Sequence, residues 1–204
     1  VHTDGGDLFP SGDERLHRGG SSGFWGPRHP RNNEWVLEGP AQSINRAEAA
    51  AVLQVLREEP RPVELRPDSE VTEMGLRGIL EGVPPDPQGA NFDIWDPIDM
   101  EVGRRPPRHV EVRRVPSHLT APQAKARGYS EQDRLRNAAA DVGATGACRR
   151  HSDVGPWVRR SVVCSAVMER LQRSLIRTVQ HRQAGLEDCL QAVQEEKGPA
   201  EDDD

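Results

Sequence analysis

Four acidic residues are the first candidates for chemistry in this sequence: Asp4, Glu48, Asp68 and Asp141. Asp4 belongs to a predicted first strand, Glu48 to the first turn of a predicted helix, and Asp68 to the end of a later strand. Asp141 lies in a helix, four residues after Asn137 and so on the same face. Strand ends and helix starts in open α/β sheets converge on one edge, so we expect the four carboxylates to meet there.

Such a group of carboxylates would repel unless cations neutralised it. Oxygen ligands without a Cys/His set fit Mg²⁺, or Mn²⁺, rather than zinc. Two ions about 4 Å apart are suited to in-line attack on a phosphodiester, because one activates water and the other stabilises the leaving oxygen. The acids therefore indicate a two-metal site.

Each acid also has a purely structural interpretation. Asp4 precedes two glycines and could lie in a hairpin turn. Glu48 could close a capping box with Asn45, and Asp68 could cap the helix that follows it. Asp141 could be one more solvated helix residue.

Asp133 competes with Asp141 for the fourth place in the group. Ser130-Glu-Gln-Asp133 is typical of a helix start, which gives Asp133 a structural role as a cap. We therefore choose Asp141 and expect Asn at position 133 to leave most activity intact.

The elements that would position these acids follow the order β-β-β-α-β-α-α-β-α. Strands are expected around Asp4 and at 23–26, 34–38, 63–66 and 108–119, and helices at 44–60, 69–82, 91–102 and from 130 to about 143. Asn91 is the expected cap of the third helix and Pro97 its break, and 120–129 is expected to be a loop. This order predicts an α/β fold with a five-stranded mixed sheet and helices on both faces.

The chain is expected to comprise a catalytic domain, residues 1–150, and a C-terminal helical extension, residues 151–204. Apolar residues recur at spacings of three and four through 157–196, which is typical of a helix that packs on a partner. The closing "EEKGPAEDDD" is expected to be an acidic disordered tail.

Composition excludes several classes of protein. The chain has 204 residues, of which 34% are hydrophobic, with no apolar run of 18 or more and no visible leader, so it is expected neither to span a membrane nor to be secreted. Its three cysteines, Cys148, Cys164 and Cys189, form neither a disulfide framework nor a zinc spacing, which favours reduced thiols in the cytoplasm or nucleus. The start at Val1 suggests a piece of a longer polyprotein.

Charge is distributed unevenly along the chain. Residues 1–100 carry 9 basic and 18 acidic side chains, residues 101–150 carry 11 and 5, and residues 151–204 carry 7 and 10. A basic segment thus follows an acidic half, so the overall charge of −6 does not exclude a nucleic-acid partner.

Five sequence blocks, in order, carry a resemblance to a known family: "TDGG", "NRAEAAAV", "PDSEV", "VPSHL" and "DRLRNAAADVGATGA". Together they resemble type 1 ribonuclease H, in its retroelement-like version, over about residues 1–147. The resemblance implies a ribonuclease H-like fold and a metal-dependent endonuclease that hydrolyses the RNA strand of RNA–DNA hybrids, leaving 5′-phosphate and 3′-hydroxyl ends.

The same resemblance implies roles for individual residues. Asp4, Glu48, Asp68 and Asp141 would bind two Mg²⁺ ions, with Mn²⁺ as a substitute, and His118 would be a mobile group for proton transfer or product release. The expected substrate contacts are Gly5, Gly6, Asn45, Ser69, Arg104 and Arg105. For the two arginines, a solvated Arg-rich face is an equal alternative to phosphate contacts.

The expected partners are an RNA–DNA hybrid, a reverse transcriptase domain of the same polyprotein, and a protein that packs on the helical tail. Two other functions stay open. One is a catalytically degenerate hybrid-binding or connector domain, and the other is a different nuclease on the same fold.

Overall fold

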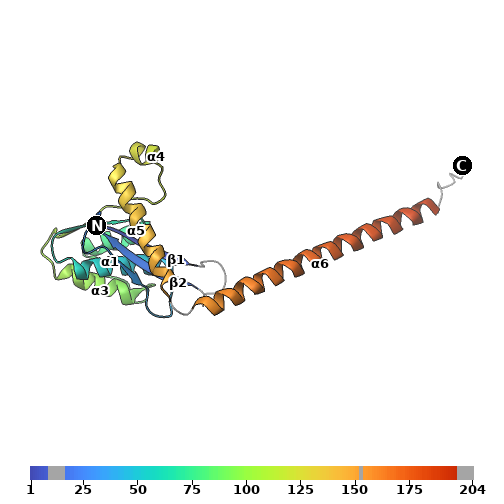
Figure 1. Ribbon diagram of the computed structural model, residues 1–204, viewed down its shortest axis with the longest axis horizontal. Coiled ribbons are helices and arrows are strands. Elements are labelled where there is room, and N and C mark those ends of the chain that lie inside the picture. The colour runs from blue at the N-terminus through green and yellow to red at the C-terminus, as the bar shows by residue number, and fades with distance from the viewer. Residues whose placement is uncertain (9–16, 152–153, 197–204) are drawn as a thin grey trace. The chain divides into compact units, whose positions relative to one another are not determined.

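The computed structural model describes residues 1–8, 17–151 and 154–196 (Figure 1). The chain divides into two compact units, residues 1–152 and 153–204. Each unit is described by itself.

The first unit is built on one five-stranded mixed sheet. Its order is β3-β2-β1-β4-β5; β1 pairs antiparallel with β2 and parallel with β4, β2 pairs antiparallel with β3, and β4 pairs parallel with β5. The strands are β1 (His2–Leu8), β2 (Arg18–Phe24), β3 (Asn33–Val36), β4 (Val63–Pro67) and β5 (Val110–Val112). The mixed five-stranded sheet expected from the sequence is confirmed.

Helices fill the connections between and after the strands. They are α1 (Ile44–Glu58), α2 (Glu70–Leu80), α3 (Phe92–Gly103), α4 (Ala121–Ala126) and α5 (Glu131–Arg149). The second unit contributes α6 (Val154–Glu196).

The two helices nearest the centre of the sheet cover opposite faces of it. A Cβ added at Gly5 would lie 2.3 Å from the backbone nitrogen of Glu48 in α1, whereas one at Gly6 would lie 3.2 Å from the Sγ of Cys148 in α5. Because successive strand residues face opposite sides, α1 and α5 must lie on opposite faces. The expectation of helices on both faces is therefore confirmed.

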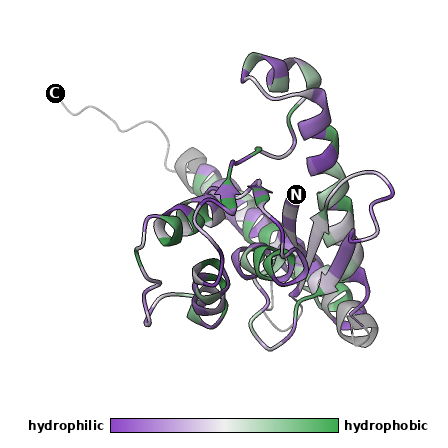
Figure 2. Ribbon diagram, turned by 90° about the vertical axis from the view of Figure 1, so that its left-hand side faces the viewer, coloured by the Kyte–Doolittle hydropathy of each residue, from purple (hydrophilic) through white to green (hydrophobic). Residues whose placement is uncertain are grey.

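The hydrophobic core lies between the sheet and the layer formed by α1, α2 and α3. Small alanines let α1 approach the strands closely, and Val52, Val55 and Leu56 fill the space beside Leu65 of β4 and Ile98 of α3. Figure 2 shows that the helices of this unit carry both apolar and polar residues, as expected for helices that bury one side.

The second strand begins earlier than the sequence indicated, at Arg18 rather than residue 23. Its sequence, RGGSSGF, has few residues of high strand propensity, so propensity gave no signal there. Tertiary packing selects small residues instead: a Cβ on Gly20 would lie 2.5 Å from the backbone nitrogen of Cys148 in α5. The third strand ends at Val36, two residues before the expected end.

The expected break at Pro97 is wrong, because α3 continues through it to Gly103. The proline loses one backbone hydrogen bond, and burial of Ile94 and Ile98 on either side of it compensates. Asn91 precedes the helix with a φ of 60° but makes no capping bond, and its side chain instead lies 3.5 Å from the Nη1 of Arg46.

The region after α3 differs from the expectation in two further ways. Regular pairing in β5 ends at Val112, although the backbone N–H of Val115 still donates to the carbonyl of Pro67 at 3.0 Å. The expected loop at 120–129 contains the short α4, which a reciprocal capping box between Thr120 and Gln123 stabilises.

Helix α5 runs to Arg149, beyond the expected end at Gly143. Glycine inside a helix costs about 1 kcal/mol relative to alanine, so local propensity argued for an earlier end. Packing decides otherwise, since a Cβ at Gly143 would lie 2.9 Å from the Cβ of Ser22 in β2.

The helical extension expected from 157 to 196 forms α6, which begins at Val154. Among the described residues, no helix is long and apolar enough to cross a membrane. The expected disordered tail falls on 197–204, outside the described residues, apart from the Glu195 and Glu196 at the end of α6.

Candidate active site

Three of the four predicted acids come together at the centre of the first unit. Asp4, Glu48 and Asp68 each offer a carboxylate oxygen, and these oxygens all lie within 4.8 Å of one another. The register of the parallel β1–β4 pair, in which Thr3 lies beside Pro67, brings the next residues, Asp4 and Asp68, to the same level. We call these three residues the acidic cluster.

Helix α1 delivers the third carboxylate of the acidic cluster. Gly5 touches the backbone of α1 at Glu48, and no other residue type would fit there. This contact holds Glu48 beside Asp4 and buries both side chains. The glycine next to the first acid therefore has a packing role that the sequence pattern did not indicate.

The structural interpretations of these three acids do not hold. Asp4 lies within a strand rather than a turn, paired with Ser22. The caps of α1 and α2 are Ser43 and Ser69, so neither Glu48 nor Asp68 is needed as a cap. The three carboxylates are left without a local structural role.

Burial and mutual repulsion perturb the acidic cluster. Burial and the charge of Asp68 raise the pKa of Asp4 to about 8. Burial, followed by the charges of Asp68 and Asp4, raises the pKa of Glu48 well above its ordinary value. The protein thus holds carboxyl groups in a place where their ionised forms are costly.

The acidic cluster fits a divalent cation. One buried oxygen of Glu48, Oε2, has no hydrogen-bond partner among the described residues. A cation would satisfy that oxygen and neutralise the charges that raise the two pKa values. The all-carboxylate donor set suits Mg²⁺ or Mn²⁺.

Asp141 and His118 lie together beside the acidic cluster. Both line a cavity of about 340 Å³, with Asn137 and Ser117 also in its wall. Asp141 is not one of the three clustered acids, but its charge contributes to the raised pKa of Asp4. His118 is exposed and has a φ of 56°, in the left-handed region.

Asn137 is a residue of this cavity to which the sequence assigned no role of its own. Its side chain is buried, and within the part of the chain that the structure describes its Oδ1 lacks a hydrogen-bond partner. The signal was its position one helical turn before Asp141.

Asp133 has the structural role that the sequence indicated. It completes a reciprocal capping box with Ser130 at the start of α5. It also forms an ion pair with Arg66 of β4 and lies 3.9 Å from the Nε2 of His2. These contacts connect α5 to the strands next to the site.

The expected substrate contacts fall into two groups. Asn45 is exposed in the first turn of α1, and Ser69 uses its hydroxyl oxygen to accept the N–H of Thr72 at 3.2 Å. Both lie near acids of the acidic cluster along the chain. Gly5 and Gly6, by contrast, lie against α1 and α5, so their lack of a side chain is explained by packing.

The expectation for Arg105 needs correction. Its guanidinium donates to the backbone carbonyls of Leu56 and Glu59, the latter at 2.8 Å, and so binds the C-terminal end of α1. Because its guanidinium is used in these hydrogen bonds, we do not include Arg105 among the proposed phosphate contacts. Arg104 is exposed and pairs with Glu101 at 2.8 Å.

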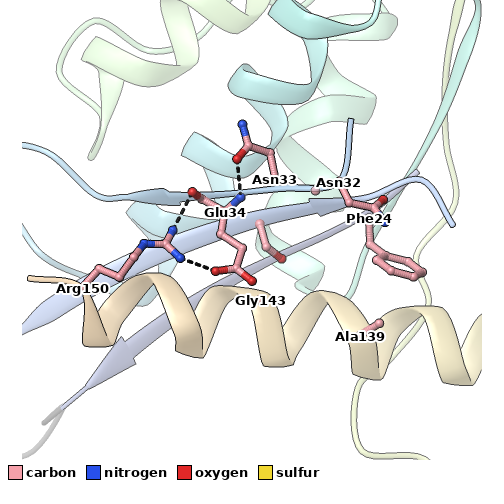
Figure 3. Close-up of a pocket in the computed structure, with 9 residues that line it drawn as sticks. Phe24, Asn32, Asn33, Glu34, Ala139, Gly143 and Arg150 are labelled. Carbon is pink, nitrogen blue, oxygen red and sulfur yellow. Dashed lines mark hydrogen bonds and ion pairs between the residues drawn. The ribbon is translucent and has the colours of Figure 1, made fainter. Parts of the chain in front are cut away.

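A second hollow lies between β2, β3 and α5, and the sequence gave no sign of it (Figure 3). Its volume is about 440 Å³. Arg150 reaches across from the end of α5 to the carboxylate of Glu34, and donates to the carbonyl of the same residue at 2.7 Å. This contact ties α5 to the edge strand of the sheet.

Comparison with known proteins gives matches in structure alone. No family model matches the chain, and no curated protein matches its sequence. The native protease-reverse transcriptase of prototype foamy virus matches with a TM-score of 0.53 and 19% identity, over 72% of this chain and 20% of that one. A CSH mutant of the same viral protein gives 0.50 and 19%, with the same coverage.

The solution structure of the RNase H domain of prototype foamy virus (PFV) matches with a TM-score of 0.49 and 18% identity, over 72% of this chain and 92% of that domain. The chain spans about a fifth of the length of the protease-reverse transcriptases. The likeness to those two structures, with the strand order β3-β2-β1-β4-β5, shows the ribonuclease H-like fold expected from the sequence.

Proposed function

We propose that this chain is a metal-dependent endonuclease that hydrolyses the RNA strand of RNA–DNA hybrids. The observation that carries the proposal is the acidic cluster: Asp4, Glu48 and Asp68 lie within 4.8 Å of one another, and two of them have raised pKa values. Buried carboxylates without a structural role are costly to keep, and catalysis is a reason to keep them.

The acidic cluster and Asp141 would hold two divalent cations, for which Mg²⁺ is the preferred choice and Mn²⁺ a substitute. When bound, such ions activate water and stabilise the leaving oxygen of a phosphodiester. Asp141, on α5, would approach the site from the cavity that it shares with His118.

His118 would move a proton at the edge of the site. It is exposed, lies in the segment that connects β5 to α4, and lines the same cavity as Asp141. An imidazole has one ring nitrogen that can accept a proton and one that can donate it, so His118 would act as a general acid or base during turnover.

Recognition of the hybrid requires a contact with the 2′-hydroxyl, the group that distinguishes RNA from DNA. Asn45 and Ser69 would make this contact, since each lies at the start of a helix that carries or follows an acid of the acidic cluster. The backbone of Gly5 and Gly6 and the exposed Arg104 would add contacts to the substrate.

We further propose that residues 1–150 form the catalytic domain and that the chain is part of a retroelement polyprotein with a reverse transcriptase domain. The likeness to a portion of a viral protease-reverse transcriptase supports this proposal.

Cleavage of labelled substrates tests the activity. The chain is incubated with RNA–DNA hybrid, duplex DNA and duplex RNA, each with Mg²⁺, Mn²⁺ or EDTA. We expect loss of RNA from the hybrid alone and only with metal. No cleavage by the folded protein with either metal would refute the proposal and favour a binding or connector domain.

Matched variants separate the chemistry from the fold. Asp68→Asn should abolish cleavage while the protein stays folded. Glu111→Gln, at an exposed position of β5, should cleave like the wild type. Equal activity of the two variants would show that the acidic cluster is not the catalytic centre.

A further inference from the structure

Helix α6 carries a row of apolar residues along one side, interrupted by one arginine. The row consists of Cys164, Met168, Leu171, Leu175, Val179, Arg182, Leu186 and Leu190, spaced by four, three and four residues in succession. This spacing repeats every 11 residues, at about 3.67 residues per turn, so the row follows the helix with little drift. We call it the α6 seam.

The α6 seam is exposed throughout. Leu175 is 65% exposed, Leu186 is 62% exposed and Leu171, the least exposed leucine of the seam, is 52% exposed. From Cys164 to Leu190 it extends ~40 Å along the helix axis. A contiguous apolar surface of this length marks an interaction site.

We propose that a second copy of α6 covers the α6 seam, and that the two helices run antiparallel. The seam has nearly the same spacing when it is read in either direction from residue 177. Antiparallel pairing about that point sets Leu175 against Val179, Met168 against Leu186, and Cys164 against Leu190 of the second copy. The seam thus complements itself.

Arg182, the charged residue of the seam, favours this direction. A parallel pair in register would bring two Arg182 side chains together in an apolar interface, where like charges are unfavourable. An antiparallel pair separates them by ~15 Å along the axis. Each Arg182 then lies at the level of residue 172 of the second copy, within one turn of Glu169.

The charge along the helix also favours an antiparallel pair. Residues 159–178 carry five arginines and one glutamate, whereas residues 179–196, up to the end of α6, carry one arginine and four acidic side chains. This order opposes the helix macrodipole, which prefers acids near the N-terminus and bases near the C-terminus. Antiparallel pairing brings the basic half of each helix to the acidic half of the other.

The arginines of the basic half do not obstruct the seam. At 100° per residue, Arg170, Arg173 and Arg177 lie on the side of the helix opposite Met168 and Leu175. All three are exposed, and Arg173 pairs with Glu169 at 3.4 Å.

Two exposed cysteines report the direction of pairing. Cys164 lies 13 residues before position 177 and Cys189 lies 12 residues after it. In the antiparallel pair, Cys164 of one copy lies one residue from the level of Cys189 of the other, whereas in a parallel pair each cysteine meets its own equivalent. Cys148 is buried in the first unit, and burial raises the pKa of its thiol to about 11, so it does not compete.

Sedimentation and mild oxidation of the full chain test the proposal. We expect the mass of a dimer at micromolar concentration, and a disulfide-linked dimer on oxidation. Cys164→Ser and Cys189→Ser should each abolish the linked dimer while the sedimenting species stays dimeric. A monomer across the micromolar range would overturn the proposal, as would a linked dimer that persists in both single variants.

A variant pair tests the seam itself. Leu175→Glu with Val179→Glu should weaken dimerisation about 100-fold or more, because charges would be buried in an apolar interface. Ala184→Glu, on the opposite side of α6, should leave the dimer intact. Equal association of the two proteins would exclude the seam as the interface, and circular dichroism at high concentration would verify that the first unit stays folded.

Discussion

Replacement of Asp68 by asparagine should stabilise the metal-free protein while it removes the metal site. The oxygens of Asp68 lie within 4.8 Å of those of Asp4 and Glu48. Two unit charges at that separation repel by about 3.5 kcal/mol at an effective dielectric constant of about 20. Asparagine keeps an oxygen that can accept a hydrogen bond from Glu48 but carries no charge.

The gain in stability of Asp68→Asn over the wild type should increase with pH. The folded-state pKa of Asp4, raised to about 8, exceeds its unfolded value, so the folded state holds the extra proton. Stability from this group is fully present below about pH 4 and is lost as pH rises through about 8. The repulsion that Asp68→Asn relieves is therefore larger at pH 9, where Asp4 is mainly ionised, than at pH 6.

We expect a gain in the free energy of unfolding of about 2 kcal/mol at pH 9 in EDTA, somewhat below the Coulomb figure because Asp68 is only partly buried and solvent screens its charge. For a domain of this size, that gain corresponds to a rise in Tm of about 4–8 °C. Thermal unfolding followed by circular dichroism at pH 6 and pH 9, with EDTA and then with Mg²⁺, measures it. Mg²⁺ should raise the Tm of the wild type and leave that of Asp68→Asn nearly unchanged.

Glu111→Gln, an exposed neutralisation on β5, is the control for a general effect of net charge. The reasoning is refuted if Asp68→Asn is less stable than the wild type in EDTA at pH 9, or if its gain is the same at both pH values.

Three further substitutions probe other parts of the first unit. Glu59→Gln should cost about 2 kcal/mol in urea unfolding at pH 7, because the buried carboxylate accepts hydrogen bonds from Arg61 and Trp25 and forms an ion pair with Arg31. The hydrogen bonds from Arg61 are the main cause of the lowered pKa of Glu59. The loss of stability in Glu59→Gln should therefore be at its largest above about pH 4.5 and shrink as pH falls through the lowered folded-state pKa. An equal loss at all pH values would contradict this. Gly5→Ala should lower Tm by about 6–12 °C, because its Cβ would meet the backbone of α1 and cost about 3 kcal/mol of strain. Gly6→Ala meets a sulfur at 3.2 Å and should cost far less, so similar Tm values for the two variants would count against the close approach of α1. His118→Ala should lower turnover of the hybrid about 10²-fold or more while the rise in Tm on addition of Mg²⁺ is kept, and loss of that rise would place the histidine in the metal site instead.

Sequence patterns predicted most of the first unit, and two of their failures, in β2 and at the end of α5, share one cause. Helices α1 and α2 were predicted because apolar periodicity and helix propensity agree there. Strand β2 and the end of α5 were misplaced, since both are rich in glycine, and local propensity opposes their observed structure. Their glycines fit because the strand and the helix lie against each other, a contact between residues far apart in the chain.

In the candidate site, too, the sequence predicted the residues but not all of their contacts. Three of the acids were predicted from their positions at a strand, a helix start and a strand end, and the structure brings these three together. Sequence gave no measure of distance, so it did not separate Asp141 from the acidic cluster or indicate that Arg105 binds the end of α1. Those outcomes depend on contacts between elements that are far apart in the chain.

The sequence by itself determined the order of the strands and the longer helices, the candidate acids and the apolar row of α6, because these depend on residue type and on spacing within one element. Tertiary structure alone decided that Gly5 serves the contact between β1 and α1, beyond any role beside the first acid. It also decided that Glu48 and Asp4 carry raised pKa values, since burial and repulsion arise only when separate elements meet.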